Sequence, residues 1–196
     1  MMGETKQTPK TYQLRISLKD VKPPIWRRIQ VSGDTNLHQL HLILQVVMGW
    51  TNSHLHMFNI GSATYSDPNA DEECERNEAK FILSKVAPTE GMVFIYEYDF
   101  GDGWRHTIKV EKILFADEAL KHPVCITGKR ACPPEDCGGP WGYIELLETL
   151  KDPESDGYDE MLDWVGEDFD SEYLDCKEIN EMLSDPDAME TVDLFD

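Results

Sequence analysis

The stretch VFIYEYDFGDGWRHTIKVEKI, residues 93–113, decides the fold, because it predicts two antiparallel strands joined by a tight turn. Aromatic side chains occupy every second position of its first half, which is typical of a strand with one buried face. The residues of that face are Phe94, Tyr96, Tyr98 and Phe100. We therefore expect a hairpin whose aromatic face belongs to the core.

The turn of this hairpin contains Asp102-Gly103, the pair that favours a two-residue type I′ turn. Such a turn predicts Asp99 opposite His106, where the carboxylate would orient the imidazole and raise its basicity. Two interpretations stay open: a polar site for general acid–base work or cation binding, and an ordinary cross-strand ion pair worth less than about 1 kcal/mol. The candidate catalytic residues are Asp99, His106, Asp102, Glu135 and Asp136.

Upstream of this hairpin, residues 12–18 and 25–31 also alternate between apolar and polar side chains, and Lys22-Pro23-Pro24 separates them. They predict a second antiparallel hairpin. Arg27 and Arg28 fall on opposite faces of it, so one cation lies on the buried side and needs an anionic partner. The acidic C-terminal segment is the expected source of that anion.

A helix is predicted after this hairpin, because apolar residues recur at helical spacing from Leu37 to Met48. Asn36 followed by Gln39 is a capping pattern, and Gly49 ends the helix. His41 lies on the apolar stripe, where a hydrogen-bonded histidine at the edge of the core is favoured over a ligand.

The order of elements is strand, strand, helix, strands and then helices, which favours an α+β fold over a doubly wound sheet. The opening is β-grasp-like by analogy. We expect a frayed N-terminus over 1–10, one domain over 11–183 and a flexible tail over 184–196. Within the domain we expect a β-rich body (11–127), a Cys/Pro/Gly loop (128–143) and acidic helices (144–183).

Charge divides the chain unequally. Residues 1–151 carry 17 Lys and Arg against 20 Asp and Glu, a net charge of −3, whereas residues 152–196 carry Lys177 against 18 acids, a net charge of −17. Such a field repels phosphate backbones, so direct nucleic-acid binding is disfavoured. Two interpretations remain for residues 152–196: a solvated acidic cap, and a surface for a basic protein partner.

The composition also bears on location. The chain has no apolar run of about 18 residues, so no transmembrane helix is expected, and residues 1–10 have no apolar region of the kind that secretory signals contain. Five cysteines without a signal indicate a reducing cytoplasm.

The loop RACPPEDCGGPWGY, residues 130–143, holds Cys132 and Cys137 with four residues between them. With His54, His56 and a spare thiol at Cys125, they offer ligands that Zn²⁺ accepts. The alternatives are cysteines buried at a tight turn, with histidines bonded to backbone, or a nucleophilic cysteine at Cys137 with a histidine base.

Four motifs occur in order along the chain: LKDVKPPIWRRIQV (18–31), MGWTNSHLHMF (48–58), YEYDFGDGWRHTI (96–108) and GKRACPPEDCGGPWGY (128–143). Together with DFDSEYLD (168–175), they resemble the plasmid pRiA4b ORF-3-like family over about residues 11–183. One departure is Met57, where an acidic residue is expected.

The resemblance implies an α+β domain from a family widespread in bacteria and archaea, sometimes near mobile elements, and it gives no catalytic residues. Some members carry resolvase-like labels, but this chain lacks a recombinase constellation and its charge opposes DNA contact.

Two functions therefore follow from the sequence. The leading hypothesis is a cytoplasmic binding or interaction module, with a structural metal as an option. The alternative is a small metal-dependent or hydrolase-like enzyme, with a polar site around Asp99, His106 and the Cys132–Cys137 loop. An enzyme needs an open cleft where polar groups converge, whereas a module would have those groups mutually satisfied.

Overall fold

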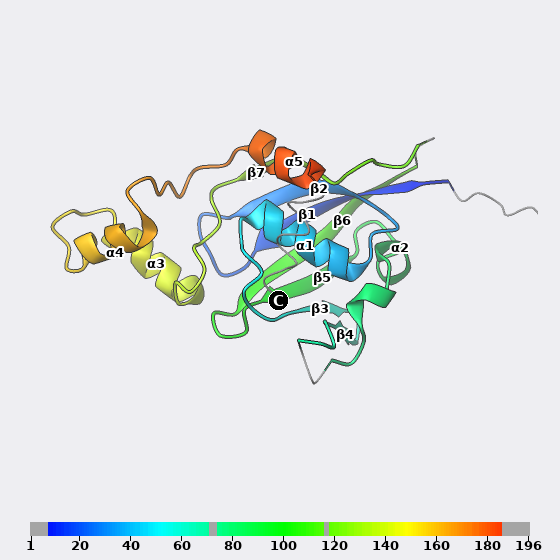
Figure 1. Ribbon diagram of the computed structural model, residues 1–196, viewed down its shortest axis with the longest axis horizontal. Coiled ribbons are helices and arrows are strands. Elements are labelled where there is room, and N and C mark those ends of the chain that lie inside the picture. The colour runs from blue at the N-terminus through cyan, green and yellow to red at the C-terminus, as the bar shows by residue number, and fades with distance from the viewer. Residues whose placement is uncertain (1–7, 71–73, 116–117, 186–196) are drawn as a thin grey trace, which may run out of the picture.

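One seven-stranded sheet forms the centre of the molecule (Figure 1). A computed structural model describes residues 8–70, 74–115 and 118–185 of the 196-residue chain. The strand order is β4-β3-β5-β6-β1-β2-β7, and each neighbouring pair is antiparallel. The strands are β1 (Lys10–Leu18), β2 (Trp26–Ser32), β3 (His56–Ile60), β4 (Ala63–Tyr65), β5 (Val93–Tyr98), β6 (Trp104–Phe115) and β7 (Val124–Lys129).

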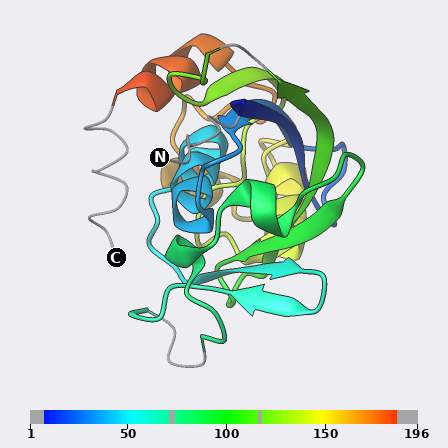
Figure 2. The ribbon, with the colours of Figure 1, turned by 90° about the vertical axis from the view of Figure 1, so that its right-hand side faces the viewer.

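Helices lie around this sheet, and both ribbon views place α1 on one of its faces (Figures 1 and 2). The α-helices are α1 (Leu37–Met48), α2 (Leu83–Val86), α3 (Gly139–Thr149), α4 (Tyr158–Val165) and α5 (Cys176–Ser184), and η1 (Glu78–Lys80) is a 3-10 helix. Helix α5 packs against β7 and α1. No helix among the residues described here is long and apolar enough to cross a membrane.

Helix α1 begins and ends where its sequence predicts. The Asn36 side chain accepts a hydrogen bond from the Gln39 backbone N–H, and the Gln39 side chain accepts one from the Asn36 N–H. Gly49 ends the helix in a left-handed conformation with φ of 87°. His41 is fully buried and hydrogen-bonded, which confirms the structural interpretation of that histidine.

The β5–β6 connection corrects the predicted turn. Tyr98 pairs with Trp104 and Tyr96 with His106, so Asp99 does not face His106. Asp99 lies in the connection with φ of 54°. Its carboxylate accepts hydrogen bonds from the backbone N–H groups of Gly101 and Asp102. This local side-chain bonding favours a longer turn over the two-residue alternative.

The buried cation of the β1–β2 hairpin also differs from expectation. Arg27 is the buried arginine, and its guanidinium donates to the carbonyls of Val47, Trp26 and Lys129 rather than to a carboxylate. On the other face, Arg28 binds Glu111 through two hydrogen bonds of 2.6 and 2.9 Å. Backbone oxygens of α1, β2 and β7 therefore take the place of the expected acidic partner.

The β-grasp analogy holds only for the order of the first elements along the chain. In the sheet, β1 lies between β2 and β6, whereas β3 lies beyond β5. The core fills the space between the sheet and α1, and its largest fully buried side chains are Trp104, Tyr12, Tyr96, Tyr98, Tyr143, Phe58 and Phe94.

Helices α3 and α4 lie at one end of the long axis, and the chain then returns to α5 beside β7 (Figure 1). Tyr143 and Leu146 of α3 are buried, but α4 has no buried residue. Trp164 of α4 is half exposed.

Candidate metal centre

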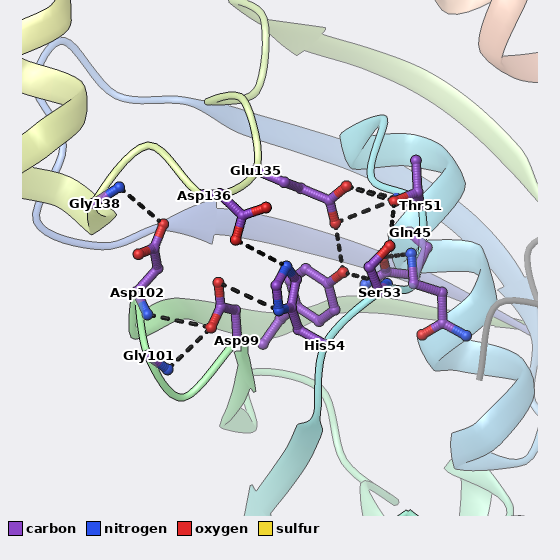
Figure 3. A network of polar contacts seen from close by, with 12 residues as sticks. Gln45, Thr51, Ser53, His54, Asp99, Gly101, Asp102, Glu135, Asp136 and Gly138 are labelled. Atoms are coloured by element: carbon purple, nitrogen blue, oxygen red, sulfur yellow. Dashed lines mark hydrogen bonds and ion pairs between the residues drawn. The ribbon is translucent and has the colours of Figure 1, made fainter.

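Three segments that are distant in sequence bring His54, Asp99 and Asp136 together (Figure 3). His54 precedes β3, Asp99 follows β5, and Asp136 belongs to the loop before α3. One ligand atom from each side chain lies within 4.8 Å of the other two. His54 Nδ1 is 3.9 Å from Asp99 Oδ2, and His54 Nε2 is 3.4 Å from Asp136 Oδ1. The imidazole thus lies between two carboxylates.

The loop that carries Asp136 is held on both sides of that residue. On one side, Glu135 accepts hydrogen bonds from the hydroxyls of Tyr98 at 2.5 Å and Thr51 at 2.6 Å. On the other side, the Gly138 N–H donates to Asp102 Oδ2 at 3.2 Å. These contacts connect the loop to the segment before His54 and to the turn that carries Asp99. The three candidate ligands are therefore positioned by one shared network (Figure 3).

Two of the three candidate ligands have an uncommon backbone conformation. Asp99 has φ of 54° and Asp136 has φ of 59°, both in the left-handed region that few non-glycine residues adopt. Such residues cost free energy and are enriched at functional sites. Asp tolerates this region better than most residues, because its short side chain bonds to nearby backbone groups.

The charge and exposure of the cluster suit a cation. The two carboxylate ligands, with Glu135 and Asp102 beside them, gather negative charge around one imidazole. The Asp99 side chain is only 10% exposed, whereas that of Asp136 is 74% exposed. Three protein ligands with one open side leave coordination positions for water or a substrate. Imidazole and carboxylate together suit Zn²⁺, Mn²⁺ or Fe²⁺.

The five metal ligands predicted from the sequence are not brought together in the described part of the chain. There, the group of His, Cys, Asp and Glu side chains close enough to share an ion consists of His54, Asp99 and Asp136. His56 bonds the buried carboxylate of Glu78 at 2.9 Å. Cys125 Sγ lies 3.8 Å from Cys176 Sγ, beside α5. His54 is the one residue of that set that enters the cluster.

The two cysteines of the loop, Cys132 and Cys137, favour the protonated thiol over the thiolate. Burial raises the pKa of Cys132 well above its usual range, and burial followed by the nearby Asp102 raises the pKa of Cys137 to about 12. Because the thiolate is the nucleophile, this opposes the nucleophile hypothesis for these residues.

The predicted dyad residue His106 lies elsewhere, inside the core. Its ring is fully buried, 5.2 Å from the Trp50 ring and 5.4 Å from the Tyr96 ring. Burial lowers its pKa to about 4. Of the predicted catalytic residues, Asp99 and Asp136 belong to the cluster, Asp102 and Glu135 lie beside it, and His106 is remote from it.

A second buried polar group was not expected from the sequence. Glu78 of η1 is 1% exposed and accepts hydrogen bonds from His38 Nδ1 at 3.1 Å and His56 Nε2 at 2.9 Å. The His56 ring stacks on the His41 ring at 3.4 Å. Glu78 lies in a polar stretch that predicts only an exposed loop, so no local pattern separates it from the acids around it.

The fold and the cluster define the class: a single-sheet α+β protein with a candidate cation centre built from three loops. The chain belongs to the plasmid pRiA4b ORF-3-like family, whose model matches residues 10–178. It is 38% identical over 176 residues to the uncharacterized protein y4hQ of Sinorhizobium fredii, covering 88% of this chain and 90% of that relative.

A solved structure is also similar. The crystal structure of the protein of unknown function MM3350 from Methanosarcina mazei Go1 matches with a TM-score of 0.78 and 39% sequence identity. The match covers 87% of this chain and 98% of that chain.

Proposed function

We propose that the protein is a binding module that holds a divalent cation at His54, Asp99 and Asp136. The observation that carries this proposal is the convergence of three ligand atoms within 4.8 Å, from three loops fixed by Glu135 and Asp102. A cation would offset the repulsion between the carboxylates, which supports their close placement. The metal that the sequence offers as an option is thus proposed here with a different ligand set.

Metal titration tests this proposal directly. We expect Zn²⁺ or Mn²⁺ to bind the wild-type protein in calorimetry with one ion per chain. Asp99→Asn and Asp136→Asn should weaken binding at least about tenfold, and Glu135→Gln should weaken it by a smaller factor through the displaced loop. Asp99→Asn is suitable because Asn retains the oxygen that accepts the turn hydrogen bonds.

Asp34→Asn is the matched control, since Asp34 is exposed and lies outside the cluster. It removes the same charge and should leave the metal affinity unchanged. Equal affinity in wild type, Asp99→Asn and Asp136→Asn would refute the site, as would the absence of stoichiometric binding by the wild type.

A metal-dependent hydrolase is the second candidate, favoured by the open side of the cluster at Asp136. A bound cation at such a site would lower the pKa of a water ligand and polarise a carbonyl or phosphoryl oxygen. The assay is turnover of activated ester and phosphate substrates by metal-loaded protein. Activity that persists in Asp99→Asn would exclude this site as its source.

The remaining expectations belong to the same proposal. Free thiols at all five cysteines support a reducing cytoplasm, and the net charge of −17 on residues 152–196 opposes direct nucleic-acid binding. The same charge supports a basic protein partner. Half-exposed Trp164, on a helix without buried residues, supports an interaction surface in this segment.

A further inference from the structure

Carboxylates and aromatic side chains line a cavity where the acidic segment returns toward the sheet. A cavity of about 300 Å³ lies between the end of α1, the loop at 131–135 and the segment 168–173. It is separate from the His54 cluster, although Glu135 borders both. The residues that give the cavity its chemistry are Trp50, Glu135, Asp168, Phe169, Asp170 and Tyr173.

The charge of the cavity has one sign. Three carboxylates line it, and no Lys, Arg or His is among its lining residues. Glu135 is held by Tyr98 and Thr51, and Asp170 accepts a hydrogen bond from the Glu172 N–H. Two of the carboxylates are thus held by bonds to neutral donors. A cationic group from outside would supply the opposite charge that the lining of this cavity lacks.

The aromatic side chains restrict the kind of cation. Trp50 is 4% exposed and its ring stacks on Tyr98 at 4.9 Å, so it closes the inner end of the cavity as a rigid apolar support, and the aromatic face open to a ligand is that of Tyr173. Phe169 also lines the cavity and packs on the core. Tyr173 is 52% exposed, and its hydroxyl is held by Glu178 at 2.6 Å. Aromatic faces next to carboxylates suit an organic cation, since a small hydrated metal ion gains nothing from an aromatic wall.

We propose that this cavity receives an arginine side chain of a basic partner protein. A guanidinium combines cation–π stacking with planar, two-pronged hydrogen bonding to carboxylates, and it is more weakly hydrated than an ammonium. The proposal rests on the basic partner proposed above and is independent of the metal centre. A second copy of this chain is a poor occupant, because each copy carries a net charge of −20.

The surrounding segment supports the same occupant. Asp168, Phe169, Asp170 and Tyr173 belong to residues 152–196, whose charge of −17 attracts a basic partner over a distance. Long-range attraction brings the partner to this face, and the cavity then binds one arginine side chain of the partner.

Binding of short peptides tests the proposal. The probe is a peptide in which arginines alternate with glycine and serine, compared with the same peptide carrying citrulline, which keeps the shape and lacks the charge. Affinity is measured by calorimetry at about 150 mM salt, where long-range attraction is screened. We expect the arginine peptide to bind at least about tenfold more tightly than both the citrulline peptide and a lysine version.

Paired variants locate the binding. Asp168→Asn with Asp170→Asn should weaken the arginine peptide at least about tenfold, since two close carboxylates are lost. Asp159→Asn with Glu160→Gln removes the same charge from α4 and is the matched control, with little expected change. Tyr173→Ala should weaken binding through the lost aromatic face. Thermal unfolding checks that each variant is folded.

The outcomes separate this proposal from the others. Equal weakening by the two double variants would show a general effect of acidity and overturn the cavity. Equal binding of citrulline and arginine peptides, or no binding, would also overturn it. Zn²⁺ or Mn²⁺ affinity should be unchanged in Asp168→Asn with Asp170→Asn, so failure of the arginine site and failure of the metal centre give different results.

Discussion

Replacing the buried carboxylate of Glu78 should destabilise the protein strongly at neutral pH and much less in acid. Glu78 is 1% exposed and accepts from His38 and His56, so it joins η1 to α1 and to β3. Glu78→Gln keeps the shape but presents an N–H group to one of two histidine donors. One buried donor is then left without an acceptor.

The pKa of Glu78 gives the size of the effect. Burial alone would raise this pKa, but the hydrogen bonds from His38 and His56 outweigh burial and lower it from 4.5 to about 2. Since one pKa unit corresponds to about 1.4 kcal/mol, the charged form is favoured in the folded state by about 3 kcal/mol. A lowered acid pKa stabilises the fold above the unfolded pKa, and this contribution is lost as pH falls from about 4.5 to about 2.

Urea unfolding of wild type and Glu78→Gln at pH 7 and pH 3 measures this contribution. We expect the variant to be less stable by about 3 kcal/mol at pH 7, with a difference about half as large or less at pH 3. Glu145→Gln, at an exposed position of α3, is the control and should differ from wild type by less than about 0.5 kcal/mol. A Glu78→Gln difference as small as that of the control, or one that does not change with pH, would refute the reasoning.

Three further results are expected. Arg27→Ala should cost about 3 to 5 kcal/mol in urea unfolding, because the carbonyls that its guanidinium binds, including that of Val47, lose their donor inside the core; a loss under 1 kcal/mol would contradict the role of these bonds. Gly139→Ala should lower the thermal midpoint, because its φ is 69° and a Cβ would lie 2.3 Å from the Asp102 carbonyl oxygen; Gly157→Ala, with a positive φ in open space, is the comparison and should cost less. Burial lowers the pKa of His106 to about 4, so wild type should lose stability as pH falls from about 6.5 to 4, whereas His106→Phe should lose less over that range; identical pH profiles would exclude His106 as a source of the loss.

The elements of this fold that could be predicted are those encoded by local patterns. The alternating stretches coincide with strands of the antiparallel pairs β1–β2 and β5–β6, and the Asn36 and Gln39 capping pattern coincides with the start of α1. The two-residue turn predicted within residues 99–103 is wrong because two local preferences compete there. Asp-Gly favours a two-residue turn, whereas the Asp99 side chain bonds to the backbone ahead of it and stabilises a longer one.

The candidate metal centre could be predicted only as separate residues. The sequence indicates His54 as a zinc ligand, whereas it indicates Asp99 and Asp136 as members of a separate polar site. Their convergence depends on how three loops meet, and a sequence pattern describes only neighbours along one segment. The spacing of Cys132 and Cys137 indicates metal ligands, whereas their burial, which raises the pKa of both thiols, depends on the fold.

The position of β1 has a consequence for how the chain emerges during synthesis. β1 pairs with β2 on one edge and with β6 on the other, and the second pairing joins Lys10 to Phe115. The first hairpin and α1 therefore leave the ribosome long before β6 can cover the other edge of β1. Contacts between such distant residues form slowly, and an uncovered strand edge pairs readily with other chains. Strand order alone thus gives this protein a period of vulnerability to aggregation in which chaperones would matter.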